Sequence, residues 1–599
     1  MKIANRFCAG LVAGAMLLSL AACGGNANSA STDTAAAGSS VSASVFSAPG
    51  TYTAAAAGIN GDVKLTVTVS ADAITNIAVE SSETPTIGAA AMDQLKQSVL
   101  ENQTIAVDAV AGATISSNAF LTALKDCIEQ AGGDLNALSG EATAAGQDYS
   151  VTNADVIVVG AGGAGLMAAM AASDEGASVI LLEKSGYVGG NTLCATMGIN
   201  AAGSAVQNAA QNPATVEDLI EIQSNNEDAR PELVQAYAEN SGEAIDYLSG
   251  LGVEFTVQED KGGNTEGHAS GAGSVMLMAE ADGKTSTTII NALNKAVEAS
   301  DVNLYLNTDV TSLITDDAGT VVGVKATADN GSEIEFTGKS IILATGGFGQ
   351  NQTLLSEMRP DLANAITDER APTTGEGLLM AQALGAETVD LDAIQLFPHV
   401  INGYGLLTPM NIPGGFKPDA IYVNENAQRF TVEGFEVSDA ILAQPEGMAY
   451  CIFNESNLND TLRSLVDTGF VVSGDTVEEL AEKLGLDADA LQTTIDQWNS
   501  DCAAGADTRF GRDFNLNPLE GTLYAYNFGV GAHYFMGGIL IDADTHVMNT
   551  DGQPINGLFA AGEVTGGFHG TTRVDGSGTG DAIVFGRISG KAAAASAKN

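Results

Sequence analysis

The residues with the clearest chemical meaning are glycines that follow a predicted buried strand. They form a GxGxxG turn between the apolar run 155–159 and a helix predicted over 166–173, with residues Gly160, Gly162, Gly163, Ala164 and Gly165. Such glycines let the backbone approach a pyrophosphate at the N-terminus of the helix. A second apolar run, 178–182, ends in Glu183, which is placed to accept hydrogen bonds from ribose hydroxyls. The spacing predicts a dinucleotide bound at the edge of a parallel sheet.

Three further glycine-rich turns favour FAD over NAD as this dinucleotide. One follows Glu183 directly, one follows a strand predicted near 341–344, and one follows a strand predicted near 557–561. The last turn carries Glu563, an acid suited to the ribityl chain. The cofactor-binding residues predicted in these turns are Lys184, Gly189, Gly190, Asn191, Thr192, Thr345, Gly346, Gly347 and Glu563.

Composition excludes some function classes. The chain of 599 residues has 74 acidic and 24 basic residues, a net charge of −50, and 45% hydrophobic residues. A surface this negative repels nucleic acid, while the hydrophobic content is enough for several cores. The cysteines after the N-terminal region, which we expect to be buried free thiols, are far apart and form no CxxC or CxxCH: Cys127, Cys194, Cys451 and Cys502.

The N-terminus is typical of an exported lipoprotein. Lys2 and Arg6 precede an apolar run over 9–20 that is too short to span a bilayer, and Leu-Ala-Ala-Cys23 follows. We expect Cys23 to be lipidated after cleavage, so that acyl chains hold the protein at the extracytoplasmic face of the membrane. Secretion without lipidation is the alternative.

The sequence predicts an α/β protein with several parts. Strands are expected at 63–69 and 74–79, and helices at 88–101, after 117, over 480–491 and over 491–498. The predicted parts are a signal peptide (1–22), a tether (23–47), an FMN-binding domain (48–133), a linker (134–152), a first FAD-domain segment (153–391), a clamp (392–521) and a second FAD-domain segment (522–599).

From about residue 154 to 591 the chain resembles the soluble fumarate reductase family, which includes urocanate reductase. The matching motifs are EK-x4-GGNT, ATGGFG, Gly375-Glu-Gly-Leu, Met536-Gly-Gly and GEVTGGFHG at 562–570. The resemblance implies a Rossmann-type FAD domain interrupted by an α+β clamp, non-covalent FAD contacts extending to His569 and Ser577, and hydride transfer to an activated C=C bond.

The small domain before it resembles the FMN-binding domain of electron-transport flavoproteins. Its mark is Asp108-Ala-Val-Ala-Gly-Ala-Thr114, which implies FMN esterified to Thr114 by a flavin transferase. FMN would then relay electrons from a membrane donor, a quinol or flavoprotein system, to FAD. The alternative is that Thr114 or Ser116 caps the following helix.

The catalytic positions depart from this family. Arg573 matches the arginine that binds the substrate carboxylate, whereas the clamp arginine that donates a proton has no counterpart after Arg429. Phe397 and Tyr534 replace two histidines, which predicts a larger and less cationic pocket. Tyr534 is our first candidate for the proton donor, or else packs as a support; the other candidates are Tyr404, His399 and His533.

We therefore expect a terminal reductase of anaerobic respiration that acts on an unsaturated carboxylate or enone bulkier than fumarate. Three alternatives remain open: a fumarate or urocanate reductase proper, a dehydrogenase like the ketosteroid enzymes, and a non-catalytic electron shuttle. The clamp segment and Arg573 argue against the shuttle, because a shuttle needs no enclosed pocket.

Overall fold

The structure is a computed structural model. It describes residues 45–599 except 60, 84–87, 106, 108–113, 134, 136–137, 139–146, 196–197, 211–212, 225–227, 259–274, 280–284, 329, 364, 368, 408–410, 435–436 and 599. The predicted signal peptide and Cys23 therefore lie outside the described residues. Within the described ranges, no helix has both the length and the apolar character needed to cross a bilayer.

The N-terminal domain is a small sheet covered by two helices. Strands β1 (Gly50–Ala57), β2 (Asp62–Val69) and β3 (Ile74–Glu80) form an antiparallel meander, and α1 (Ala90–Asn102) and α2 (Thr114–Gln130) complete the domain. Alternate residues of β2 and the face of α2 carrying Phe120, Leu124 and Ile128 are buried in one core. Both predicted strands and both predicted helices are present, while β1 was not predicted.

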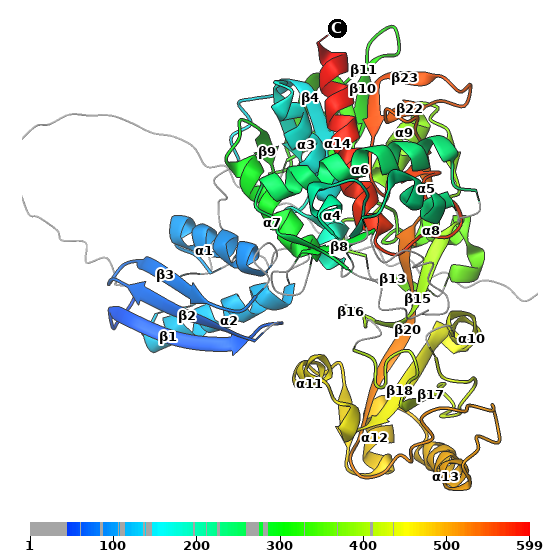
Figure 1. Ribbon diagram of the computed structural model, residues 1–599. Coiled ribbons are helices and arrows are strands. Elements are labelled where there is room, and N and C mark those ends of the chain that lie inside the picture. Colours follow the sequence, from blue (N-terminus) through cyan, green and yellow to red (C-terminus); the bar gives the residue numbers. More distant parts are fainter. Residues whose placement is uncertain are drawn as a thin grey trace, which may run out of the picture. The chain divides into compact units, whose positions relative to one another are not determined.

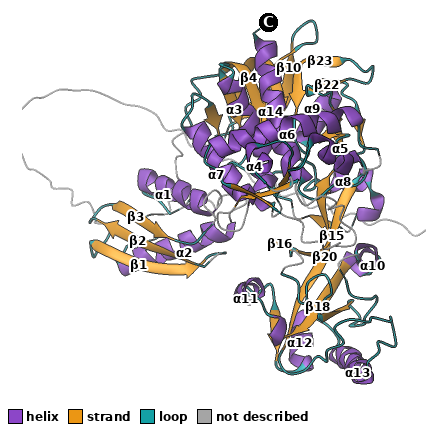
Figure 2. Ribbon diagram, viewed as in Figure 1, coloured by secondary structure: helices purple, strands orange, loops and turns teal. Residues whose placement is uncertain are grey.

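The large domain is built on a mostly parallel sheet (Figures 1 and 2). Strands β12 (Glu333–Leu343), β4 (Asn153–Val159), β5 (Val179–Leu182) and β9 (Asn303–Tyr305) are parallel neighbours in that order. β11 (Val321–Thr327) pairs antiparallel with β12, and β10 (Asp309–Thr315) pairs antiparallel with β11 at the edge of the sheet. β23 (Pro554–Ala560) also pairs with β12, and β22 (His546–Met548) pairs with β23. The continuous apolar runs of β4 and β5 are buried, as expected for strands covered on both faces.

Two helices of small residues cover this sheet. Helix α3 (Gly163–Asp174) packs on α14 (Ser577–Ala597), and at Gly586 a Cβ would lie 2.5 Å from the Ala164 carbonyl oxygen. Glycines thus allow the two backbones to approach. The remaining helices of this domain are α4 (Ala205–Asn208), α5 (Val216–Ser224), α6 (Pro231–Gly250), α7 (Thr285–Glu298), α8 (Gln352–Met358) and α9 (Glu376–Ala383). Short strands complete it: β6 (Ile199–Asn200), β7 (Phe255–Val257), β8 (Met276–Ala279), β13 (Ile366–Thr367), β14 (Thr388–Val389), β21 (Gly538–Leu540) and β24 (Thr565–Gly566).

The clamp is an antiparallel sheet with helices around it. Its strands are β15 (Ile394–Ile401), β16 (Gly405–Leu406), β17 (Ala420–Val423), β18 (Met448–Asn454), β19 (Val472–Gly474) and β20 (Leu523–Phe535). Its helices are α10 (Ser438–Leu442), α11 (Asp460–Asp467), α12 (Val477–Leu484) and α13 (Ala488–Ala504). The first half of β20 pairs with β18 and the second half with β15, so the expected boundary at 522 lies one residue before a strand of the clamp sheet.

Three expectations need correction. The helical pattern over 480–491 is interrupted, because Gly485 ends α12 in a left-handed conformation (φ 71°) and α13 begins three residues later. Helix α3 starts at Gly163 and not at residue 166, because the glycines of the turn already form its first turn. Among the cysteines, Cys127 and Cys451 are buried as expected, Cys502 is half-buried, and Cys194 is exposed.

Candidate active site

The predicted glycine turn leaves no room for side chains on its protein side. Gly160 has a φ of +99°, and a Cβ there would lie 2.4 Å from the Ala344 carbonyl oxygen. A Cβ at Gly165 would lie only 1.8 Å from the Gly160 carbonyl oxygen. Because neither position accepts even a methyl group, the turn is held tightly between β4, β12 and α3.

On its outer side the same turn is open. Gly162 precedes α3 without a side-chain cap, and a Cβ there would meet nothing nearer than the Gly189 carbonyl oxygen at 4.0 Å. The Gly163 amide donates to Thr192 Oγ1 at 3.3 Å, so Thr192 borders this opening. A helix N-terminus with uncapped amides beside open space fits a pyrophosphate.

Glu183 lies where a ribose is expected. Its buried carboxylate accepts the Ala161 and Ser185 amides, both at 2.8 Å, and burial raises its pKa above the ordinary value. Each oxygen of a carboxylate has two lone pairs, so both oxygens can still accept a ribose hydroxyl. Lys184 is different: its Nζ donates to Thr374 Oγ1 at 2.8 Å and to Glu376 Oε1 at 2.9 Å, so its side chain is engaged within the protein.

The other predicted turns meet around Asn191, in a 3₁₀ turn over Gly190–Cys194. Its Oδ1 accepts the Arg370 amide at 2.9 Å, and its Nδ2 donates to Glu563 Oε2 at 3.3 Å. A Cβ at Gly347 would lie 3.2 Å from the Glu563 carboxyl carbon, so the third and fourth glycine turns are in contact through Glu563. Nearby, the buried Thr345 Oγ1 has no hydrogen-bond partner among the described residues, as expected of a group that awaits a ligand.

A β-bulge shapes the substrate side. Gln395 on β15 lies opposite Tyr534 on β20, but the next pair is Leu396 with Ala532, so His533 is an extra residue on β20. Such a bulge breaks the alternation of side chains and re-aims them. The ring of His533 lies 4.6 Å from that of Phe397, centroid to centroid.

Arg573 lies against this bulge. Its Nε donates to Gln395 Oε1 at 2.8 Å, and its Cζ is 4.6 Å from the centre of the Tyr534 ring. Neither terminal nitrogen has a hydrogen-bond partner among the described residues. The guanidinium is thus held at one edge and along its plane, with its two NH₂ groups available. That arrangement can bind a carboxylate through two parallel hydrogen bonds.

Tyr534 is held in turn by two buried residues. Its hydroxyl donates to Asp581 Oδ2 at 2.9 Å and lies 3.2 Å from His569 Nε2. Burial, followed by the charges of Asp581 and Glu563, raises the Tyr534 pKa well above its ordinary value. Burial also lowers the pKa of His569, which favours the neutral imidazole. Gln395 and Asp581 were not among the predicted catalytic or cofactor-binding residues.

The structure separates two predicted proton donors from this cluster. His399 is fully buried in the clamp, with Nε2 2.7 Å from the Tyr422 hydroxyl and Nδ1 2.9 Å from the Tyr526 hydroxyl, and burial lowers its pKa to about 3. Tyr404 packs on Phe470 in the clamp core, with ring centres 5.8 Å apart. Among the predicted donors, only His533 and Tyr534 lie near Arg573.

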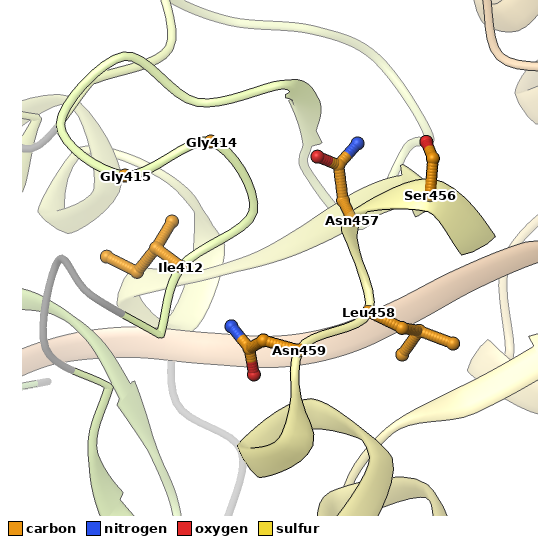
Figure 3. A pocket seen from close by; sticks show the side chains of 7 residues that line it. All are labelled: Ile412, Gly414, Gly415, Ser456, Asn457, Leu458 and Asn459. Carbon is orange, nitrogen blue, oxygen red and sulfur yellow. The ribbon is translucent and has the colours of Figure 1, made fainter.

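The clamp also contains a surface pocket of about 400 Å³ (Figure 3). It is lined by Ile412, Gly414, Gly415, Ser456, Asn457, Leu458 and Asn459, none of which is a predicted site residue. Its two asparagine amides are already bonded, Asn457 to Asp419 and Asn459 to the Asn411 carbonyl oxygen. The pocket therefore offers little to bind a substrate.

In the small domain, α2 begins at Thr114, while 108–113 lie outside the described residues. Ser116, in the first turn of this helix, donates to the buried Glu83 carboxylate. Ser116 is thus engaged as a side-chain donor.

The fold and the glycine turns define an FAD-binding flavoprotein. A family model described as an FAD binding domain matches residues 155–579, and one described as an FMN-binding domain matches residues 58–129. The chain is 34% identical to urocanate reductase of Eggerthella lenta over 607 aligned residues, covering 96% of each protein. It is also 34% identical to NADH:fumarate oxidoreductase of Klebsiella pneumoniae, covering 90% of this chain and 57% of that protein.

Among solved structures, the open conformation of a flavocytochrome c3 fumarate reductase matches with a TM-score of 0.69 and 33% identity, covering 75% of this chain and 79% of that one. The chain belongs to the fumarate and urocanate reductase-like family of FAD-dependent flavoproteins, with an N-terminal FMN-binding domain. It is an FAD-dependent oxidoreductase that acts on CH–CH bonds, as the sequence predicted.

Proposed function

We propose that this protein reduces the C=C bond of an α,β-unsaturated carboxylate that carries a bulky, preferably aromatic, substituent. The geometry of the Arg573 guanidinium supports this proposal. Its guanidinium is held by Gln395 and Tyr534, while both terminal NH₂ groups remain without a partner among the described residues.

The two buried arginines of the clamp make the contrast clear. Arg429 donates to Glu433 and Asp507, and Arg512 donates to Glu433 and to three backbone carbonyl oxygens. Both are neutralised inside the clamp. In a chain with a net charge of −50, an arginine that is positioned but not neutralised is an anion site.

The opposite side of the pocket supports a bulky substituent. A second carboxylate, as in fumarate, would need a second cationic partner. Here the Phe397 ring packs against the His533 ring at a tilt, and Tyr534 is neutral because its pKa is raised. An aryl group can pack on these rings with favourable edge or face contacts.

The residues present fit the required chemistry. FAD held by the glycine turns and Glu183 would, in its reduced form, supply the hydride that reduces the alkene. Arg573 binds the carboxylate, which orients the alkene and stabilises the enolate-like charge that develops on it. A proton must then reach the other carbon, and His533 and Tyr534 are the predicted donors within this cluster.

A panel of acceptors tests this proposal. Purified protein would be assayed with dithionite-reduced viologen against fumarate, urocanate, trans-cinnamate and a methyl ketone analogue of cinnamate. We expect an aryl acrylate to give the highest kcat/KM. Faster turnover of fumarate would contradict the assignment of a bulky substituent, and faster turnover of the ketone would contradict the carboxylate anchor.

We further propose that electrons reach FAD through FMN esterified to Thr114, and that Cys23 carries a lipid anchor at the extracytoplasmic face of the membrane. The FMN-binding domain match and the sequence around Thr114 support the first part. The N-terminal lipoprotein pattern supports the second. A membrane electron donor, a quinol or flavoprotein system, and a flavin transferase are the partners that this arrangement requires.

Mass spectrometry of the peptide containing Thr114 tests the covalent flavin. We expect an FMN-phosphate adduct that is lost in Thr114→Ala and kept in Thr122→Ala, which alters an exposed threonine of the same helix. Thr114→Ala should keep viologen-driven activity and lose turnover driven by a membrane donor. Equal loss of both activities would contradict the relay role. Labelling with a radioactive fatty acid would show whether Cys23→Ser prevents lipidation.

A further inference from the structure

Asp581 is a buried carboxylate that accepts a hydrogen bond from Tyr534, whose ring contacts Arg573, the proposed ligand of the substrate carboxylate. It lies in the second turn of α14, is 1% exposed, and its Oδ1 has no hydrogen-bond partner among the described residues. A buried carboxylate is costly unless it is paired or hydrogen-bonded. Its partners among the described residues are the Tyr534 hydroxyl at 2.9 Å and His569 Nε2 at 3.6 Å.

The hydrogen bond to Asp581 determines where the hydroxyl proton of Tyr534 is donated. An ionised carboxylate only accepts hydrogen bonds, and a phenol has a single proton to give. With that proton donated to Asp581, the neutral His569 can bond the phenol oxygen only by donating from Nε2, at 3.2 Å. The Tyr534 hydroxyl is therefore fully engaged on its inner side and has no proton left for a substrate.

The aromatic ring of Tyr534 contacts Arg573. Arg573 lies over it with its Cζ 4.6 Å from the ring centre, a distance at which cation–π attraction is effective. Donation of the hydroxyl proton to a carboxylate makes the ring richer in electrons and strengthens that attraction. Since the Asp581 carboxylate bonds the far end of the phenol, it acts on Arg573 through the ring and does not form an ion pair with it among the described residues.

Packing fixes the same arrangement. A Cβ at Gly578 would lie 2.5 Å from Arg573 Nη1 and 2.9 Å from Tyr534 Cε2, so the first turn of α14 contacts both side chains. Gln395, which holds the Arg573 Nε, is the direct cross-strand partner of Tyr534. Three elements, β15, β20 and α14, thus converge on one guanidinium.

We propose that Asp581 is a positioning residue that acts through Tyr534 to orient Arg573 for the substrate carboxylate, and that Tyr534 is the aromatic support of this anion site and not the proton donor. The inference rests on the proposed function, in which Arg573 binds the carboxylate of the acceptor. It leaves His533 as the predicted donor that stays in the cluster.

Binding to the oxidised holoenzyme tests the inference without turnover. The probes are 3-phenylpropanoate and its neutral analogue 4-phenyl-2-butanone, followed by the change in flavin absorbance. We expect Asp581→Asn and Tyr534→Phe each to weaken binding of the carboxylate about tenfold and of the ketone less than twofold, because each keeps the ring but removes the hydroxyl–carboxylate bond that orients it and strengthens the cation–π contact. The double variant should be no weaker than Tyr534→Phe alone, because Asp581 acts through that hydroxyl.

Two comparisons complete the test. Glu243→Gln removes the carboxylate that bonds Arg587 and Lys591 farther along α14, and should leave both affinities unchanged. In steady-state assays with trans-cinnamate, Tyr534→Phe should raise KM and keep kcat within about threefold, whereas loss of a general acid costs about 10²–10⁴-fold. A hundredfold fall in kcat at constant KM would overturn the inference.

The outcomes separate this inference from the proposed function. If the wild-type protein binds both probes equally, the carboxylate site is wrong and the inference fails with it. If the wild type prefers the carboxylate, and Arg573→Gln removes the preference while Asp581→Asn and Tyr534→Phe keep it, only the role of Asp581 is refuted. Flavin-to-protein absorbance ratios identify any variant that does not fold.

Discussion

Replacing Arg573 by lysine is the sharpest test of the carboxylate anchor. Lysine keeps the positive charge but loses the planar fork, the Nε contact with Gln395 and the flat face that stacks on Tyr534. If carboxylate binding depended on charge alone, the substitution would be mild. If it depends on the oriented fork, the loss should be large.

The structure gives the size of the effect. Nε is bonded to Gln395, so two NH₂ groups remain for the substrate, and each charge-assisted hydrogen bond contributes about 1.5–3 kcal/mol. Lysine can replace one of them but not both. Taking a value in the lower half of this range, because Arg573 is partly exposed, the net loss is about 2 kcal/mol, or about 30-fold in kcat/KM. Arg573→Gln removes the charge as well and should cost several times more.

The assay compares trans-cinnamate with its methyl ketone analogue under viologen-driven turnover. We expect the lysine variant to lose about 30-fold in kcat/KM for the acid and less than threefold for the ketone. Loss of less than threefold for the acid would show that the fork is not used. An equal loss for both acceptors would place Arg573 in general support of the fold.

Two further predictions concern cofactor retention and the clamp. Gly165→Ala should abolish folding, because its Cβ would lie 1.8 Å from the Gly160 carbonyl oxygen, whereas Gly162→Ala should fold but lose FAD, because its methyl group would have the nearest protein atom 4.0 Å away and would occupy the cofactor side. Circular dichroism measures folding and the flavin-to-protein absorbance ratio measures FAD content. A Gly162→Ala protein that retains all its FAD would contradict the pyrophosphate site. Burial lowers the His399 pKa from the ordinary 6.5 to about 3 in the folded protein. The contribution of neutral His399 to the stability of the clamp is therefore complete above pH 6.5. It falls by about 1.4 kcal/mol per pH unit as the pH drops below 6.5. His399→Asn, which suits the positive φ of 63°, should remove this part of the acid sensitivity. The free energy of unfolding at each pH is measured by the fluorescence of the single tryptophan, Trp498 in α13. Parallel pH dependences of the wild type and the variant would contradict this role of His399.

The cofactor fold could be predicted because its determinants are close in sequence. Within about thirty residues, an apolar strand, a glycine turn, a helix and a second strand ending in Glu183 follow in fixed order. Local sterics at Gly160 and Gly165 enforce that order. The break at Gly485 was as local, but the apolar spacing continued across it and concealed the end of the helix.

Long-range features were not predictable in this way. The sequence could not show that β20 pairs with β18 along its first half and with β15 along its second, because strand pairing is set by tertiary packing. The exposure of Cys194 had no local signal either, since the residue lies in a short 3₁₀ turn with its thiol beside Arg370 Nη1, 3.4 Å away.

The candidate site shows the same division. Arg573 and Tyr534 were candidates from the sequence because each stands within a recognisable motif. Asp581 was not, because it lies 47 positions from Tyr534 and acquires its meaning only when α14 packs against β20. Tyr404 and His399 had the right chemistry but are held in the clamp core by aromatic neighbours, which residue type alone does not reveal.

The two ends of the proposed pocket differ in how freely they can change. The anchor depends on contacts from three elements, since Gln395, Tyr534 and the first turn of α14 all touch Arg573. Altering any of these contacts displaces the Arg573 guanidinium, which has no ion-pair partner among the described residues, and so weakens carboxylate binding. The far end includes Phe397 and the bulge residue His533, whose rings contact each other. A bulge accepts new side chains without shifting the strand register on either side. The same scaffold can therefore keep one carboxylate site and vary the substituent that the pocket admits.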